Sequence, residues 1–287
     1  MKFESGNWVL FILLSIVWGS SFILMKEGLI YLSAWEVASI RVIAAGLVLL
    51  PLAIKSFREI PNEKKGYVIL SGTLGSLLPA YLFCIAEEQV SSALAGVFNS
   101  LTPVFVLLVG ALFFGQSTKP GKILGITVAF LGSVLLFFSQ ENTQSNNIIY
   151  VMFIVIATFF YGLNVNIVNR NLKGLPSLKV VSLALVFNAI PAMVVLLNTD
   201  YFSKSFNGQF LWGTFCACIL GWAGTALASV LFYKLIKQAG IVFSSMVTYG
   251  IPVVAIIWGM LYGEDVGIAQ WSCMFIILLG VFLATRK

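Results

Sequence analysis

The sequence predicts an all-α membrane protein in which ten transmembrane helices form two inverted five-helix repeats around a central cavity. Of the 287 residues, 60% are apolar and only 10% are charged. About a quarter of the residues in a soluble domain are charged, so this chain could not cover a water-exposed surface, whereas lipid suits its composition. Run lengths, charge placement and an internal repeat support the rest of the prediction.

Ten apolar runs each approach or exceed the roughly 20 residues that a helix needs to cross the hydrocarbon core of a bilayer. In chain order they cover 6–26, 35–55, 67–86, 91–114, 121–139, 148–169, 178–198, 210–233, 241–262 and 267–285. The longest gaps, around 56–66 and 199–209, are too short to hold a folded domain. The chain is therefore predicted to have no soluble domain.

The lysines and arginines predict the orientation of these runs. With the N-terminus in the cytoplasm, 14 of the 17 cationic side chains fall on the inner side, and only Lys26 and Lys204 fall on the outer side. Arg41 lies within the second run. Because cytoplasmic loops are enriched in lysine and arginine, both termini are predicted to be cytoplasmic. The formal charge of +6 then faces lipid headgroups and does not indicate nucleic-acid binding.

The two halves of the chain resemble each other. Several glycine, glutamine and proline pairs share an offset of 149 residues: Gly72 with Gly221, Gly75 with Gly224, Gln89 with Gln238, and Pro103 with Pro252. The predicted repeats are 6–139 and 148–285. Each holds five runs, and because five is odd, the second repeat enters the membrane from the opposite side. This arrangement is typical of secondary transporters, although gene duplication also builds membrane proteins that transport nothing.

The first run could alternatively be a cleaved signal peptide, with the small residues 19–21 as its cleavage site. Removal would leave nine runs and the same charge bias. The repeat argues against cleavage, because Trp18-Gly19 in the first run parallels Tyr161-Gly162 in the sixth.

The WGSSF stretch at 18–22, Arg41 in the second run and the proline-containing fourth and ninth runs resemble an EamA-type transporter of the drug/metabolite transporter superfamily. The segments FFGQ (113–116) and LYGE (261–264) strengthen this resemblance, which covers nearly the whole chain. The resemblance implies a central cavity and transport, often export, of amino acids or other small metabolites across a bacterial inner membrane. Gln116 stands where family repeats typically carry glutamate, which puts a charged role there in doubt.

Polar groups within spans are costly in lipid, so they are expected to face protein or a water-filled cavity. The predicted cavity residues lie on the first, fourth, sixth and ninth runs: Trp18, Ser21, Asn99, Thr102, Asn164, Ser245, Thr248 and Tyr249. Pro103 and Pro252 are expected to break their helices and free backbone carbonyls. Helix packing is the alternative role for these small polar faces, and the glycines of the third and eighth runs are expected mainly to pack.

Arg41 lies about two turns inside the outer end of the second run. It could attract a substrate carboxylate or gate the outer vestibule, or it could instead bind backbone carbonyls or headgroups. No carboxylate lies deep in any run, because Glu36, Glu87 and Glu88, like the other outer acids, lie near run ends. This pattern disfavours proton-coupled efflux of lipophilic cations and favours neutral, zwitterionic or anionic solutes.

The chain has no histidine, the commonest general base and metal ligand, and no phosphate-binding loop. We therefore expect no enzyme activity, cofactor or metal, and expect a small-molecule substrate and membrane lipids as partners. The leading hypothesis is an exporter of amino acids or similar metabolites that works by alternating access. Uptake of sugars, nucleosides or vitamins is the alternative, and an intramembrane enzyme is less favoured. The substrate, the coupling ion and the oligomeric state, a monomer included, stay open.

Overall fold

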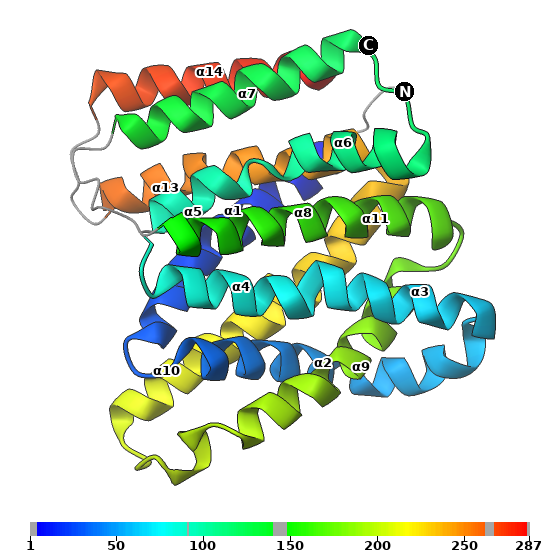
Figure 1. Ribbon diagram of the computed structural model, residues 1–287, viewed down its shortest axis with the longest axis vertical. Helices are drawn as coiled ribbons and strands as arrows, with labels where there is room; N and C mark the ends of the chain where they lie inside the picture. Colours follow the sequence, from blue (N-terminus) through cyan, green and yellow to red (C-terminus); the bar gives the residue numbers. More distant parts are fainter. Residues whose placement is uncertain (1–4, 91, 140–147, 262–266, 286–287) are drawn as a thin grey trace.

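The computed structural model describes residues 5–90, 92–139, 148–261 and 267–285, and these residues form helices and connecting turns without a β-strand. The helices run back and forth along one direction in a single bundle (Figure 1). Among the described residues, seven helical segments are long and apolar enough to cross a membrane, and three shorter apolar helices bring the number to ten. The prediction of ten membrane helices is confirmed.

Six spans are single helices: α1 (Ser5–Leu29), α2 (Ala34–Glu59), α7 (Pro120–Phe138), α8 (Ile148–Asn171), α9 (Ser177–Leu197) and α14 (Ile268–Thr285). The third span consists of α3 (Asn62–Gly72), η1 (Thr73–Leu77) and α4 (Leu78–Glu87), and the fourth of α5 (Ser92–Asn99) and α6 (Thr102–Phe114). The eighth consists of α10 (Gly208–Ile219), η3 (Leu220–Leu227) and α11 (Ala228–Ala239). The ninth consists of α12 (Ile241–Ser245), η4 (Met246–Tyr249) and α13 (Gly250–Leu261). A short 3₁₀ segment, η2 (Asp200–Ser203), lies between α9 and α10.

The four interrupted spans are equivalent in the two repeats. The π-helical segments η1 and η3 overlap when one sequence is shifted by the 149-residue offset. The α-helical geometry of the fourth and ninth spans is lost immediately before Pro103 and Pro252, which lack the backbone N–H that continues a helix. The helix is thus interrupted beside the two prolines that were expected to break it, and also within the third and eighth spans, which composition predicts as continuous. Protein and cavity can satisfy the carbonyls that these interruptions free.

Packing contacts also repeat across the two halves. Helices α7 and α14 lie side by side along one edge of the bundle (Figure 1). A Cβ atom on Gly132 of α7 would lie 2.9 Å from the backbone nitrogen of Ile277, and one on Gly280 of α14 would lie 2.7 Å from the Cα of Ala129. The two contacts are equivalent, because Gly280 and Ile277 of the second repeat correspond to Gly132 and Ala129 of the first at an offset of 148 residues. The two repeats are therefore packed as inverted copies.

Local sequence signals explain where several helices end. Ser33 and Glu36 form a capping box at the start of α2, which satisfies two backbone N–H groups. Gly115 ends α6 with a φ of +62°, a conformation that favours glycine. The eighth span was predicted to end at 233, but α11 continues past Lys234 and Lys237 to Ala239, because its buried face continues as Leu235, Ile236 and Ala239.

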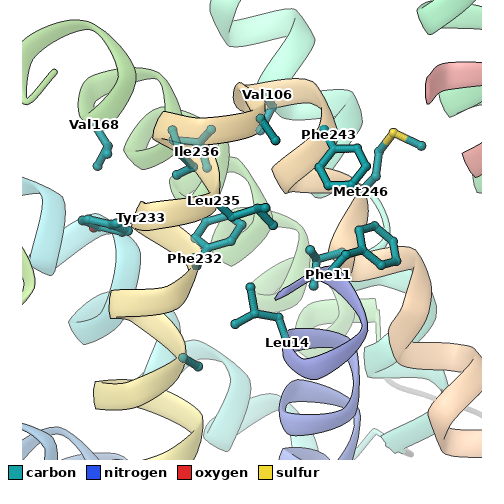
Figure 2. Packing of buried hydrophobic residues seen from close by; sticks show 14 of the residues in the cluster. Phe11, Leu14, Val106, Val168, Phe232, Tyr233, Leu235, Ile236, Phe243 and Met246 are labelled. Carbon is teal, nitrogen blue, oxygen red and sulfur yellow. The ribbon is translucent and has the colours of Figure 1, made fainter. Parts of the chain in front are cut away.

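A large apolar cluster fills the end of the bundle at which α1 begins and α14 ends. Figure 2 shows Phe11 and Leu14 of α1 facing Phe232 of α11 and Phe243 of α12. The Phe11 and Phe243 rings lie 5.5 Å apart, and Trp8 packs edge-on against Phe243 at 5.1 Å. Tight aromatic packing of this kind excludes water from that end of the bundle.

Candidate functional site

A cavity lies between the two repeats. Its volume is about 100 Å³, several times the roughly 10–15 Å³ that one water molecule needs. The first repeat contributes to its wall Trp18, Ser21, Phe22, Met25, Arg41, Gly75, Ser76, Phe83, Asn99 and Thr102. The second repeat contributes Tyr161, Asn164, Val165, Gly224, Thr225, Ser229, Phe232, Tyr233, Thr248 and Ile251. Polar groups and aromatic rings thus alternate around a site to which both repeats contribute.

Most of the predicted cavity residues lie on this wall, and two do not. Those on the wall are Trp18, Ser21, Asn99, Thr102, Asn164 and Thr248, together with Arg41. Tyr249 is fully buried behind the wall, where its hydroxyl donates a hydrogen bond to the carbonyl of Ile126 at 2.9 Å. Ser245 is also fully buried, and its hydroxyl donates to the carbonyl of Val242 at 3.0 Å. Both hydroxyls bind backbone carbonyls inside the bundle, and neither residue lines the cavity.

Arg41 enters the cavity from α2. Its Nε and Nη2 atoms donate to the hydroxyl of Thr225 at 3.4 and 3.2 Å, and its Nη1 atom lies 3.9 Å from the sulfur of Met25. Within the described part of the chain, Arg41 takes part in no ion pair. It is also the only charged residue among those that line the cavity in the described residues. Its charge therefore dominates the electrostatics of a site that is otherwise neutral.

The π segment η3 positions the hydroxyl that Arg41 contacts. Thr225 donates to the carbonyl of Leu220, five residues earlier, at 3.2 Å, which is the spacing of a π turn. The equivalent residue of η1 is Ser76, which also lines the cavity. Each repeat thus uses a π segment to direct one hydroxyl into the cavity, and such segments are frequent at functional sites.

The glycines of the third and eighth spans divide into two groups. Gly72 and Gly221 pack closely against neighbouring helices, as predicted for the whole set. Gly75 and Gly224 instead line the cavity, and a Cβ atom on Gly224 would lie 2.7 Å from the Oγ atom of Ser21. The matched Gly-Ser and Gly-Thr pairs of the two repeats are the sequence signal that could have assigned these positions to the cavity.

The broken fourth and ninth spans present short polar segments to the cavity. The hydroxyl of Thr102 donates to the carbonyl of Asn99 at 2.8 Å, across the break between α5 and α6. In the second repeat, Thr248 of η4 donates to the carbonyl of Ser245 at 3.0 Å. These threonines satisfy carbonyls that the interrupted helices leave free, as membrane proteins require where backbone is irregular. Pro103 and Pro252 thus lie at the predicted breaks, one turn or less from a residue of the wall.

Phe232 and Tyr233 of α11 are among the residues of the wall that were not predicted. The indole N–H of Trp18 donates to the carbonyl of Gly224 at 3.0 Å and its ring packs against Phe232 at 5.0 Å. Tyr233 donates from its hydroxyl to Oδ1 of Asn164 at 3.0 Å, which joins α11 to α8. Phe232 and Tyr233 fall at the end of a predicted run, where aromatic residues are ordinarily interfacial anchors, so composition alone does not place them at the cavity.

Gln116, the position at which the first repeat departs from the family pattern, has a neutral structural role. Its Nε2 atom donates to Oδ1 of Asn166 at 3.0 Å, and Asn166 donates in turn to the carbonyls of Val106 and Gly162 at 3.0 and 2.9 Å. Asn166 is fully buried and Gln116 is partly exposed, and their hydrogen bond ties the end of α6 to α8. The second-repeat counterparts, Gly263 and Glu264, lie outside the described residues.

Two inverted five-helix repeats that enclose a polar cavity between them define a membrane transporter. The EamA-like transporter family matches the chain twice, at residues 6–138 and 148–286. The chain belongs to this family, which is part of the drug/metabolite transporter superfamily.

Several relatives carry names that describe transporters. An "Uncharacterized transporter" of Archaeoglobus fulgidus is 25% identical over 288 residues, covering 98% of this chain and 99% of that protein. The "Uncharacterized inner membrane transporter YedA" of Escherichia coli K12 is 25% identical, covering 95% and 88%. A "Probable amino-acid metabolite efflux pump" of the same strain is 26% identical, covering 67% and 64%. A solved crystal structure has the same fold, with a TM-score of 0.76 and 14% identity over 98% of this chain and 97% of that one.

Proposed function

We propose that this protein is a secondary carrier, not an enzyme, that exports amino acids or similar small metabolites bearing a carboxylate. The observation that carries the proposal is the guanidinium of Arg41, which forms no ion pair among the described residues and lies in an otherwise neutral cavity. A carboxylate can accept charge-assisted hydrogen bonds from this group, which are stronger than those between neutral partners. The aromatic rings of the wall suit the apolar part of such a solute.

Alternating access follows from the position of the cavity between the repeats. We infer that the segments 6–139 and 148–285 act as the two moving units, because each supplies about half of the wall. The cluster around Phe11, Leu14 and Phe243 (Figure 2) closes the end of the bundle at which α1 begins and α14 ends (Figure 1). Opening toward that end requires these side chains to separate. The contacting rings of Trp18 and Phe232 lie between this cluster and the cavity, and they can move as the substrate passes.

We propose that both termini face the cytoplasm and that the protein resides in the inner membrane. Two lysines lie in the first turns of helices at the predicted cytoplasmic side: Lys64 of α3 donates to the carbonyl of Asn171 at 2.8 Å, and Lys179 of α9 pairs with Glu59. A GFP fusion at the C-terminus should fluoresce and an alkaline phosphatase fusion there should be inactive. As the matched control, phosphatase inserted after the exposed Ser205 should be active. The reverse activities would contradict this orientation.

A flux screen tests the carrier function directly. Purified protein in liposomes would be loaded with a ¹⁴C-labelled mixture of amino acids and, in parallel, with sugars, nucleosides and vitamins. We expect selective efflux of one or more carboxylate solutes relative to protein-free vesicles, without ATP. Selective movement of an uncharged sugar or nucleoside alone would replace the proposed substrate class. No selective flux of any component would contradict the carrier function.

A further inference from the structure

Glu87 is a buried acid that the proposed transport site does not use. It is the last residue of α4, and its side chain is only 3% exposed. Both carboxyl oxygens are shielded from solvent, and neither has a hydrogen-bond partner among the described residues. The next residue, Glu88, is exposed and accepts a hydrogen bond from the backbone N–H of Ala34 at 3.0 Å. The chain thus places two adjacent glutamates in opposite environments.

An ionised carboxylate in the position of Glu87 would be expensive. Removing a carboxylate from water is costly even after the protein relaxes, unless a partner offsets the loss. The charges of Lys26 and Arg41 act on Glu87, but neither side chain forms an ion pair with it. A protonated carboxyl avoids most of this cost, because burial then removes a neutral group from water.

The elements packed against α4 offer few other titratable groups. On α4 itself, the sulfur of Cys84 lies 3.3 Å from the sulfur of Met25. On α8, Tyr161 is close enough to Arg41 to be affected by its charge. Glu36 of α2 is already paired with Lys204 at 2.5 Å. Neither α5 nor η1 carries a titratable side chain. In the described part of the chain, Arg41 and Lys26 are therefore the cations whose pairing with Glu87 could change with its charge.

Glu87 lies just beyond the cavity. Phe83, which lines the cavity, precedes it by four residues, a rise of about 6 Å along the helix. Residues four apart share a helix face, so Glu87 continues the face of α4 that Phe83 turns to the cavity. It does so at the end of the bundle opposite the termini. An ionised Glu87 would compete with a substrate carboxylate for the guanidinium of Arg41.

We propose that Glu87 is a proton-binding site whose occupancy is linked to substrate binding in the cavity. A proton on Glu87 leaves Arg41 free for the carboxylate of a substrate, and loss of the proton directs Glu87 toward Arg41 and disfavours that substrate. Such linkage is reciprocal, so a bound carboxylate also favours the proton. The linkage, but not the proton binding, rests on the proposed carboxylate transport. In this proposal the proton binds from, and returns to, the outer side of the membrane, where the exported substrate is released. Transport therefore requires no net movement of protons across the membrane.

Infrared spectroscopy of the purified full chain in nanodiscs tests proton binding without a substrate. At about pH 7, where exposed glutamates are ionised, the wild type should show a carboxylic C=O band at the high frequency of an acid without a hydrogen-bond partner. Glu87→Gln should lose this band, and Glu88→Gln, the matched control, should keep it. Should Glu87→Gln fail to fold, Glu87→Asp should shift the band. A wild-type spectrum without the band would overturn the proposal.

Equilibrium exchange of the ¹⁴C-labelled amino-acid mixture tests the linkage. The half-saturating concentration should rise in the wild type and in Glu88→Gln over the pH range in which the infrared band disappears. Glu87→Gln should show a half-saturating concentration that does not change over this range, because glutamine stays neutral. An unaltered pH dependence in Glu87→Gln would overturn the linkage. If the flux screen itself fails, the infrared result still decides whether Glu87 holds a proton, so the two failures can be told apart.

Discussion

Arg41→Ala should abolish or strongly reduce transport of carboxylate solutes while the protein stays folded in the membrane. A hydrogen bond to a charged group contributes about 1.5–3 kcal/mol, so the loss predicts roughly a 10- to 100-fold weaker apparent affinity. Folding should tolerate the change because the hydroxyl proton of Thr225 already bonds to the carbonyl of Leu220 at 3.2 Å. The Thr225 hydroxyl therefore keeps its hydrogen-bond acceptor when Arg41 is removed.

The measurement is uptake and efflux of the labelled mixture in proteoliposomes, with folded yield determined by size-exclusion chromatography. Arg58→Ala is the matched control, because Arg58 lies on the same helix, α2, but is exposed near its opposite end. Arg41→Lys keeps the charge and loses the planar fork, so it should retain part of the affinity. Loss of Arg41→Ala from the membrane would instead assign the residue a structural role, and normal transport would contradict the anion-binding role.

Run length and charge bias predict the membrane helices because they depend on lipid as the solvent and not on tertiary contacts. The bounds of α8 and α9 therefore fall within two residues of the predicted runs. The π segments could not be predicted in this way, because the wider turn is stabilised by contacts with other spans. Thr225 illustrates the limit: its place on the cavity wall depends on both the carbonyl of Leu220 and the guanidinium of Arg41.

The burial of a side chain at a helix end could not be predicted from the sequence either. Glu87 and Glu88 are identical in chemistry and adjacent in the chain, yet only Glu87 is buried. The difference arises because successive helix positions are turned by about 100°, so only one of two adjacent residues faces the helices that pack against α4, which include α1, α2 and α8. A single sequence gives the depth of a residue in the membrane more reliably than the direction in which its side chain points.

Gly280→Leu should destabilise the folded protein more than a comparable change at an open glycine. A Cβ atom on Gly280 would already lie 2.7 Å from both the Cα and the Cβ of Ala129 on α7. The helices would have to separate, because backbone atoms cannot rotate away as side chains do. Overpacking of a close contact typically costs about 1–3 kcal/mol, and more where backbone must move. The expected result is a lower Tm in detergent and a smaller folded fraction.

Gly121→Leu provides the matched control, because no heavy atom lies within 4 Å of a Cβ atom there, and Gly121 belongs to α7, the other helix of the pair. Leucine is the better helix former, so this variant should be as stable as the wild type or slightly more so. The symmetry of the repeats adds a second requirement: Gly132→Leu, which meets the backbone nitrogen of Ile277 at 2.9 Å, should lower the Tm in the same direction as Gly280→Leu. A stable Gly280→Leu protein, or opposite effects at the two positions, would contradict the close α7–α14 contact and with it the packing of the repeats as inverted copies.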